Sequence, residues 1–424
     1  MSMLRNSSHD LSAAEGALQG ASLKNALAQG RAFAHIAKFH PELTAFRRDL
    51  HANPELGFEE IYTSGRVVEA LKVCGVDSIH TGIGKTGVVA LVHGQGRSAH
   101  NPGRMIGLRA DMDALPLPEH NDSLWKSKNA GLMHACGHDG HTAMLLGAAQ
   151  QLAKTKNFKG TVHLVFQPAE EAGKDSGAQQ MIADGLFERF PCDAIFGIHN
   201  HPGVEVGTFM FGAGAFMSAS DTCYIKVKGK GGHAARPHQT VDPVVIMGSL
   251  IMSLQTVVSR NIDPLQTSVV TIGTAHAGSV SNVIPDTASL SMSIRSFSPE
   301  VRERLEHRIK DLVTAQVASF GGEVEIIYER GYPVVINSVA ETEFARQVAV
   351  ELVGEDKVVS PFGPVTGSED FAYYLQHKPG CFLRLGNGTD SALLHNPKYD
   401  FNDQNLSYGA AYWTRLVERF LDAA

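Results

Sequence analysis

The stretch HACGHDGHTAMLLGAAQQLAKTKNFKGTVHLVFQ, residues 134–167, decides the expected fold. It begins with a histidine-rich turn, continues as an apolar helical run over 142–154 and ends in an apolar strand over 161–167. Helices that alternate with apolar strands are typical of a sheet covered by helices on both faces. The same alternation extends outward on both sides, with helices expected at 41–53, 65–72 and 179–186 and strands at 87–93, 105–110 and 194–199. The sequence therefore predicts an α/β domain built on a mixed sheet.

The pattern changes between residues 213 and 327. The expected order there is strand, helix, two strands, helix and strand, which is a ferredoxin-like α+β arrangement. Its elements are predicted at 221–228, 243–258, 268–274, 288–295, 299–320 and 323–328. The chain then returns to the first domain, with helices at 341–352 and 405–421 around a loop segment over 367–395. We therefore expect an N-terminal extension (1–39), a first domain (40–212 and 328–424) and an inserted second domain (213–327).

Composition excludes several functional classes. The 424 residues carry a net charge of −7 and contain no long basic run, which argues against binding to nucleic acid. Apolar residues make up 43% and charged residues 19%, as in a soluble globular protein, and no membrane-spanning segment is expected. The five cysteines form no Cys-x-x-Cys pair. An odd number of scattered cysteines favours a reducing, cytoplasmic location.

The turn over 134–141 has the chemistry of a metal site. Cys136 and His138 offer a thiolate and an imidazole, which together suit Zn²⁺ or a neighbouring transition metal. A neutral imidazole ligand usually has a carboxylate behind it, and Asp139 is the expected partner. Cys136 and His138 are therefore candidate ligands.

Further candidates follow other apolar strands. Glu170 and Glu171 come just after the strand 161–167, and His199 closes the strand 194–199. The carboxyl ends of neighbouring parallel strands meet at one edge of a sheet, so these side chains are expected to lie together. Metal-dependent hydrolysis needs a ligand carboxylate and a second carboxylate that carries a proton. His395, after an apolar pair near the C-terminus, is a further possible ligand.

Seven ordered motifs together resemble the M20 metallopeptidase clan, from about His40 to the end of the chain. The most similar branch is that of the hippurate hydrolases, N-acyl-amino-acid amidohydrolases and auxin-conjugate hydrolases. The motifs are LRADMDALP (108–116), HACGHDGH (134–141), QPAEE (167–171), GIHN (197–200), GHAARP (232–237), NVIPD (282–286) and GSEDF (367–371).

The resemblance implies a site for two divalent ions, of Zn, Mn, Ni or Co. Cys136 would bridge the ions, Glu170 would act as general base, and the remaining ligands would be His138, Glu171, His199 and His395. Many clan members have a metal-binding histidine where this chain has Arg109, which cannot ligate. Asp111 is therefore expected to orient a ligand or the sheet edge.

The resemblance also assigns roles to the second domain. His233 would reach the oxyanion in the partner subunit's active site, which implies a homodimer or a dimer-based tetramer. Asn282 and Arg295 are similar to the family's contacts with the substrate carboxylate, and an Arg suits that task because it can pair bidentately. The second domain would thus serve as a lid and dimerisation domain.

The resulting hypothesis is a metal-dependent amidohydrolase that splits N-acyl amino acids, hippurate-like or N-acetylated. A dipeptidase or carboxypeptidase with the same site is the first alternative. A hydrolase in which His138 activates Cys136 as a nucleophile is another, although it leaves Glu171, His199 and His395 without a use. A non-catalytic metal-binding protein is the third, although a purely structural site needs no base such as Glu170.

Overall fold

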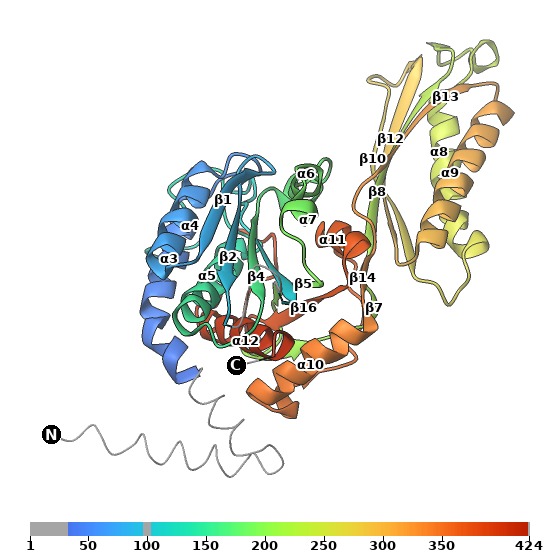
Figure 1. Cartoon of the computed structure of the whole chain (residues 1–424). Helices are drawn as coiled ribbons and strands as arrows, with labels where there is room; N and C mark the ends of the chain where they lie inside the picture. Colours follow the sequence, from blue (N-terminus) through green and yellow to red (C-terminus); the bar gives the residue numbers. More distant parts are fainter. Residues whose placement is uncertain (1–32, 96–102, 423–424) are drawn as a thin grey trace.

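The computed structural model describes residues 33–95 and 103–422. Of the expected N-terminal extension, residues 1–32 lie outside this range. Figure 1 shows a large body, in which helices enclose a sheet, and a smaller elongated body at the upper right. Both bodies follow from the amphipathic patterns of the sequence.

The sheet of the large body is mixed. Its strand order is β1-β2-β4-β3-β5-β16-β6-β15. Strands β4, β3, β5 and β16 run parallel to one another. Strand β2 is antiparallel to both of its neighbours, β1 and β4. The strands are β1 (Ser78–Ile83), β2 (Gly87–His93), β3 (Met105–Asp111), β4 (Thr161–Gln167), β5 (Ala194–His201), β6 (Phe209–Met210), β15 (Val358–Val359) and β16 (Gly380–Gly386).

Helices cover both faces of this sheet, because its strands are apolar on both sides. Successive side chains of a strand point to opposite faces, and Val88 and Val89 of β2 belong to two different cores. One core receives α3 (His40–Ala52), α4 (Ile61–Cys74), α5 (His138–Thr155), α10 (Val339–Val353) and α12 (Asn405–Phe420). The other receives α6 (Gly177–Ala183), α7 (Leu186–Arg189) and α11 (Phe371–His377). The predicted fold class is confirmed.

Two local predictions were wrong. The segment 367–395, expected as a loop, contains α11 and the central strand β16. The run of β16 is short and interrupted by Arg384, and pairing with β5 and β6 on either side makes it a strand. The helix expected over 179–186 is instead two short helices. Gly185, at a φ of 81°, separates α6 from α7.

The smaller body has its own four-stranded antiparallel sheet, in the order β10-β12-β8-β13. Helices α8 and α9 pack on it, and their core includes Leu250, Leu290 and Ile309. The elements are β8 (Ala219–Lys228), α8 (Pro243–Asn261), β10 (Ser268–Ala277), β12 (Thr287–Ser296), α9 (Pro299–Ser319) and β13 (Glu323–Arg330). This is the expected β-α-β-β-α-β order.

The two chain segments that join the bodies lie side by side. Strand β7 (Gly214–Met217) pairs with β14 (Val335–Asn337). Strand β13 ends at Arg330, three residues beyond the expected end of the second domain at residue 327. Strands β9 (Gly232–His233) and β11 (Val283–Ile284), which are far apart in the sequence, form a separate two-stranded antiparallel sheet in the smaller body. The domain boundaries stay a prediction.

Helix α8 is the one helix of the described residues that is long and apolar enough to cross a membrane. Its buried side chains include Ile246, Leu250, Leu254 and Val257, which pack in the core of the smaller body. We therefore interpret α8 as a core helix of that body.

Candidate metal centre

The structure brings together all five expected ligands and Glu170. Their ligating atoms form overlapping groups, and within each group the atoms lie within 4.8 Å of one another. Cys136 Sγ lies 3.3 Å from His199 Nε2, and His395 Nε2 lies 3.1 Å from Glu171 Oε1. The groups are Cys136 with His138 and His199, Cys136 with Glu171 and His395, and His138 with Glu170 and Glu171. Cys136 is buried and His395 is exposed, so the cluster reaches the surface.

A glycine turn presents Cys136 and His138. Gly137 has a φ of 92°, and α5 begins at the next residue. A Cβ at Gly137 would lie 2.0 Å from Asn200 Nδ2 and 2.7 Å from the hydroxyl of Tyr399. Asn200 Nδ2 donates to the carbonyl of Cys136 at 2.6 Å, and the Tyr399 hydroxyl donates to Asn200 Oδ1 at 3.0 Å. The close approach that fixes Cys136 thus requires glycine at 137.

Asp113 orients two ligands at once. His138 Nδ1 donates to the carbonyl oxygen of Asp113 at 2.9 Å and lies 3.2 Å from Asp113 Oδ1. Asp113 Oδ2 accepts from the backbone N–H of Glu171 at 2.8 Å. His138 Nε2 is buried and has no hydrogen-bond partner among the described residues. An imidazole held through Nδ1, with Nε2 left free, has the geometry of a metal ligand.

The expectation that Asp139 stands behind the ligands needs correction. Its Oδ2 lies 2.8 Å from His51 Nδ1 and 3.2 Å from Arg47 Nε, both on α3. Successive residues of a helix point about 100° apart. Asp139 therefore faces α3 while His138 faces the cluster. Asp113 was not among the predicted site residues, although it lies two residues beyond Asp111 in the same motif.

His199 and His141 differ in how their ring nitrogens are used. His199 Nδ1 donates to the carbonyl of Asn200 at 2.7 Å, which leaves Nε2 directed to Cys136. His141 uses both ring nitrogens, because Nδ1 lies 2.6 Å from Asp111 Oδ1 and Nε2 accepts from the Asn200 N–H at 3.1 Å. Asp111 Oδ2 also lies 3.6 Å from His138 Nε2. Asp111 thus lies beside two histidines.

Arg109, which cannot bind a metal ion, belongs to a buried network of charged side chains. Its guanidinium donates to Asp111 Oδ2 at 2.6 Å, to Glu369 Oε1 at 2.9 Å and to Asp370 Oδ1 at 3.0 Å. Burial raises the pKa of Glu369 to about 8 even though Arg109 opposes this shift. The network thus links β3 to the start of α11.

Glu170 is buried in this acidic surrounding. Burial and the nearby carboxylates of Glu369, Glu171 and Asp370 raise its pKa well above the ordinary value. The hydroxyl of Tyr332 donates to the backbone carbonyl of Glu170 and accepts from the Gly173 N–H, the latter at 2.8 Å. A carboxyl group whose pKa is raised toward neutral pH is suited to general acid and base catalysis.

The donor set fits divalent ions. Burial and the charge of Glu171 raise the pKa of the Cys136 thiol, and hydrogen bonds to Cys136 and Glu171 raise the pKa of His395 to about 10. At short range the cluster combines the carboxyl groups of Glu170 and Glu171 with a thiol and imidazole nitrogens. Cations bound between a thiolate, imidazoles and carboxylates would compensate the crowded negative charge.

The other expected residues lie on the smaller body. His233 is exposed in β9, and the backbone N–H of Ala234 donates to the carbonyl of Asn282 at 3.1 Å, so His233 and Asn282 are close neighbours. Neither belongs to a ligating group in the part of the chain that the structure describes. Arg295 is half-buried in β12, and its Nη1 donates to the hydroxyl of Ser368 at 3.1 Å. It therefore contacts the segment that carries Glu369.

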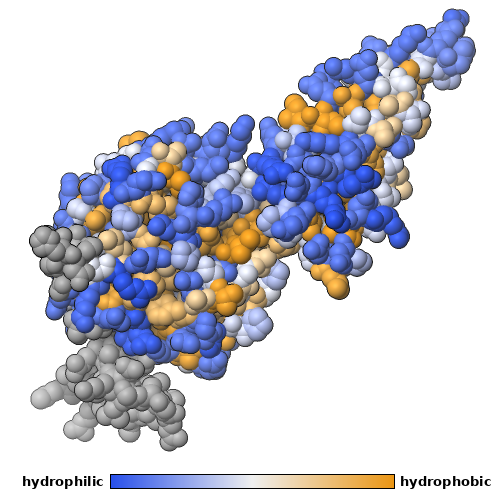
Figure 2. All heavy atoms as spheres, turned by 45° about the vertical axis from the view of Figure 1, so that its right-hand side comes forward, coloured by the Kyte–Doolittle hydropathy of each residue, from blue (hydrophilic) through white to orange (hydrophobic). Residues whose placement is uncertain are grey.

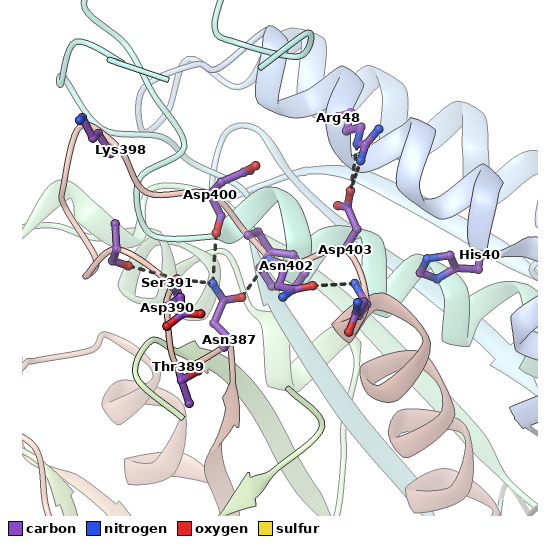
Figure 3. A pocket seen from close by; sticks show the side chains of 14 residues that line it. His40, Arg48, Asn387, Thr389, Asp390, Ser391, Lys398, Asp400, Asn402 and Asp403 are labelled. Atoms are coloured by element: carbon purple, nitrogen blue, oxygen red, sulfur yellow. Dashed lines mark hydrogen bonds and ion pairs between the residues drawn. The ribbon is translucent and has the colours of Figure 1, made fainter. Parts of the chain in front are cut away.

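A cavity of about 650 Å³ lies away from the ligating atoms, between α3 and the segment 387–404. Figure 3 shows that its polar side chains bind one another. Arg48 pairs with Asp403 at 2.8 Å, and Asn387 Nδ2 donates to Ser391 at 2.9 Å. None of the cluster's ligands lines this cavity. The cavity is therefore not the candidate active site, although the segment 387–404 also carries His395.

Comparison with known proteins agrees with this geometry. Residues 107–419 match the profile of Peptidase family M20/M25/M40. The chain is 42% identical over 386 residues to a hippurate hydrolase of Campylobacter jejuni, covering 91% of this chain and 98% of the relative. It is 38% identical over 390 residues to an N-acetyl-L-cysteine deacetylase of Bacillus subtilis, covering 92% and 90%. The crystal structure of the Bacillus subtilis YXEP protein, a dinuclear metal binding peptidase, matches with a TM-score of 0.79 and 32% identity, covering 92% of this chain and all of that one.

Proposed function

Since the chain belongs to peptidase family M20/M25/M40, we propose that it is a metal-dependent amidohydrolase that splits N-acyl amino acids into a carboxylic acid and a free amino acid. The observation that carries the proposal is the convergence of Cys136, His138 and His199 with Glu171 and His395 beside the buried Glu170. Relatives that act on hippurate and on N-acetyl-L-cysteine support the substrate class.

Cys136, His138, Glu171, His199 and His395 would hold two divalent ions, of Zn, Mn, Ni or Co. When bound, such a pair polarises a carbonyl and makes water acidic. The free Nε2 of buried His138 and the thiol that lies between His199 and His395 support this assignment. Asp113 and Asp111 would orient the histidines, as carboxylates beside ligating imidazoles do.

Glu170 is the proposed proton carrier. Its carboxylate would take a proton from the attacking water and later pass it to the leaving nitrogen. Burial in an acidic surrounding supports this role, because a raised pKa lets the group keep the proton between the two steps. His233 would donate to the developing oxyanion, and Asn282 and Arg295 would bind the substrate carboxylate.

A homodimer, or a tetramer built from dimers, completes the proposal. His233 is exposed on the smaller body and lies outside the ligand cluster of its own chain. A second copy could supply it to the site. Figure 2 shows apolar surface on the smaller body. Val245, Met252 and Val280 of this body are exposed. Mixing His233→Ala with Glu170→Gln subunits tests the idea, since activity should return only in mixed dimers.

All five cysteines are unpaired. Free thiols support the proposed cytoplasmic location, because oxidising compartments favour disulfides.

The deciding experiment combines elemental analysis with a substrate panel. Two equivalents of metal per chain and hydrolysis of benzoyl- or acetyl-amino acids are expected, with loss of activity on chelation and recovery on metal addition. Glu170→Gln should keep its metal, while kcat falls by orders of magnitude. Near-normal kcat in this variant would reject the assigned role.

The same experiment separates the alternatives. Faster cleavage of dipeptides with a free amine would indicate a dipeptidase, and faster release of C-terminal residues from peptides a carboxypeptidase. Alkylation that abolishes activity without releasing metal would favour Cys136 as a nucleophile. Bound metal without hydrolysis of any substrate would indicate a binding protein.

A further inference from the structure

Arg384 is a buried cation that lacks an anionic partner. Its residue is 4% exposed, and its Nε is buried without a hydrogen-bond partner. The one hydrogen bond that its guanidinium makes within residues 33–95 and 103–422 is from Nη2 to the thioether sulfur of Met217, at 3.2 Å. A thioether is a weak acceptor. Buried charges are normally paired, because a buried charge without a partner is strongly destabilising.

Arg384 lies inside the candidate active site. In the parallel pair of β16 and β5, it is the register partner of His199, a proposed metal ligand. Register partners on neighbouring strands project from the same face of a sheet and stand about 4.8 Å apart. Nε2 of this register partner, His199, lies 3.3 Å from Cys136 Sγ, so Arg384 stands beside the ligand cluster. Burial lowers the pKa of the guanidinium, and the nearby Glu369, Cys136 and Glu170 oppose that shift.

The nearby acids do not neutralise it. Glu369 is the acid with the largest electrostatic effect on Arg384. It already accepts hydrogen bonds from Arg109 at 2.9 Å and from the Phe371 N–H at 3.1 Å. Glu170 is the proposed proton carrier and has a raised pKa. By contrast, Arg109 pairs with three carboxylates on the same sheet. Arg384 is therefore a guanidinium that has no carboxylate at hydrogen-bond distance among the described residues, and a carboxylate from outside the chain would complete its pairing.

We propose that Arg384 binds a carboxylate of the substrate and thereby selects anionic N-acyl amino acids. The inference rests on the proposed function. A guanidinium can bind a carboxylate through two parallel hydrogen bonds, which gives orientation as well as affinity. The carboxylate is either the α-carboxylate of the amino acid or one on the acyl group. Arg295 lies on β12 of the smaller body, so Arg384 is a separate contact on the large body.

The test measures discrimination between matched substrates. One pair is N-benzoylglycine and N-benzoylglycinamide, which differ in the α-carboxylate. The other is N-succinyl- and N-butanoylglycinamide, which differ in an acyl carboxylate. For Arg384→Met, the ratio of kcat/KM between carboxylate and neutral substrate should fall about 30- to 100-fold in one pair, as expected for a lost charged contact. The pair that changes identifies the carboxylate that is bound.

Two controls keep the test decisive. Arg415 is a buried arginine of α12 that pairs with Glu351 at 3.2 Å, so Arg415→Met should leave both ratios unchanged. Arg384→Lys keeps the charge and should retain part of the discrimination even if the methionine variant folds poorly. Competitive inhibition gives a second readout. In both Arg384 variants the preference for succinate over butanoate should weaken if an acyl-side carboxylate is bound, and the preference for glycine over glycinamide should weaken if the α-carboxylate is bound.

Unchanged ratios in both substrate pairs would overturn the inference and make Arg384 a structural residue. A wild-type enzyme that binds metal but hydrolyses no N-acyl amino acid would instead overturn the proposed function. The two failures are therefore distinguishable.

Discussion

The hydroxyl of Tyr332 donates a hydrogen bond to the backbone carbonyl of Glu170. Tyr332 lies two residues beyond the end of β13, in the segment that leads from the smaller body back to the sheet of the large body. The same hydroxyl accepts from the Gly173 N–H at 2.8 Å, so it spans the short turn that carries the two acids. The position of Glu170 is thus tied to the connection between the two bodies.

Tyr332→Phe should therefore lower kcat about 10- to 100-fold, because a small displacement of a catalytic group has effects of that size. Metal content should stay at the wild-type level, and KM should change little. Steady-state kinetics with elemental analysis checks this. Equal losses in kcat and metal content would instead mean that the tyrosine supports the whole cluster.

Asp113→Asn should weaken metal affinity about 10- to 100-fold, as substitutions behind ligating histidines do. The reason is that Asp113 touches both His138 and the N–H of Glu171. Asp139→Asn is the matched control, since Asp139 contacts Arg47 and His51 instead. It should lower thermal stability and keep metal affinity. Competition with a chelator of known affinity measures both, and the reverse ranking would restore Asp139 as the residue behind the ligands.

Gly137→Ala should disrupt the metal turn. Its Cβ would lie 2.0 Å from Asn200 Nδ2, and a φ of 92° is unfavourable for alanine. Gly131→Ala is the control, because its φ is also positive, at 81°, but a Cβ there meets nothing within 4 Å. The control should lose about 1 kcal/mol, the cost of the backbone conformation alone. The Gly137 variant should lose clearly more, together with its metal. Similar unfolding free energies for the two variants would contradict the steric argument.

His51 should make stability depend on pH. Burial lowers its pKa, but hydrogen bonds to Asp139 and Glu119 outweigh burial and raise it from 6.5 to about 9. A raised pKa in the folded state means that the contribution is complete below pH 6.5 and is lost as the pH rises through about 9. The shift corresponds to at most about 3 kcal/mol.

Urea unfolding of wild type and His51→Gln tests this. The difference in unfolding free energy should shrink between pH 6.5 and 9, whereas the exposed His276→Gln should match wild type throughout. A difference that stays constant with pH would show that His51 is neutral in the folded protein.

Local chemistry explains which parts of the fold and site could be predicted. Strands β2 and β4 have the expected bounds, because apolar residues dominate each run and His163 is the one polar residue inside β4. The run of β16 contains Arg384, and only pairing with β5 and β6 makes it a strand. Cys136 and His138 were identifiable because few structural roles need a thiol and an imidazole so close in sequence. Their supporting carboxylate was not, because Asp113 and His138 are 25 residues apart.

The sequence by itself determined the alternation of helices and strands and the chemical types of the ligands. Both depend on the period of apolar residues and on the identity of side chains, which are local properties. Only the tertiary structure decided that Asp113 stands behind His138, that Tyr332 holds the turn of Glu170, and that Arg384 enters the site without a counter-anion. These relationships join residues that are distant in the chain, and they arise from the packing of strands and helices against one another.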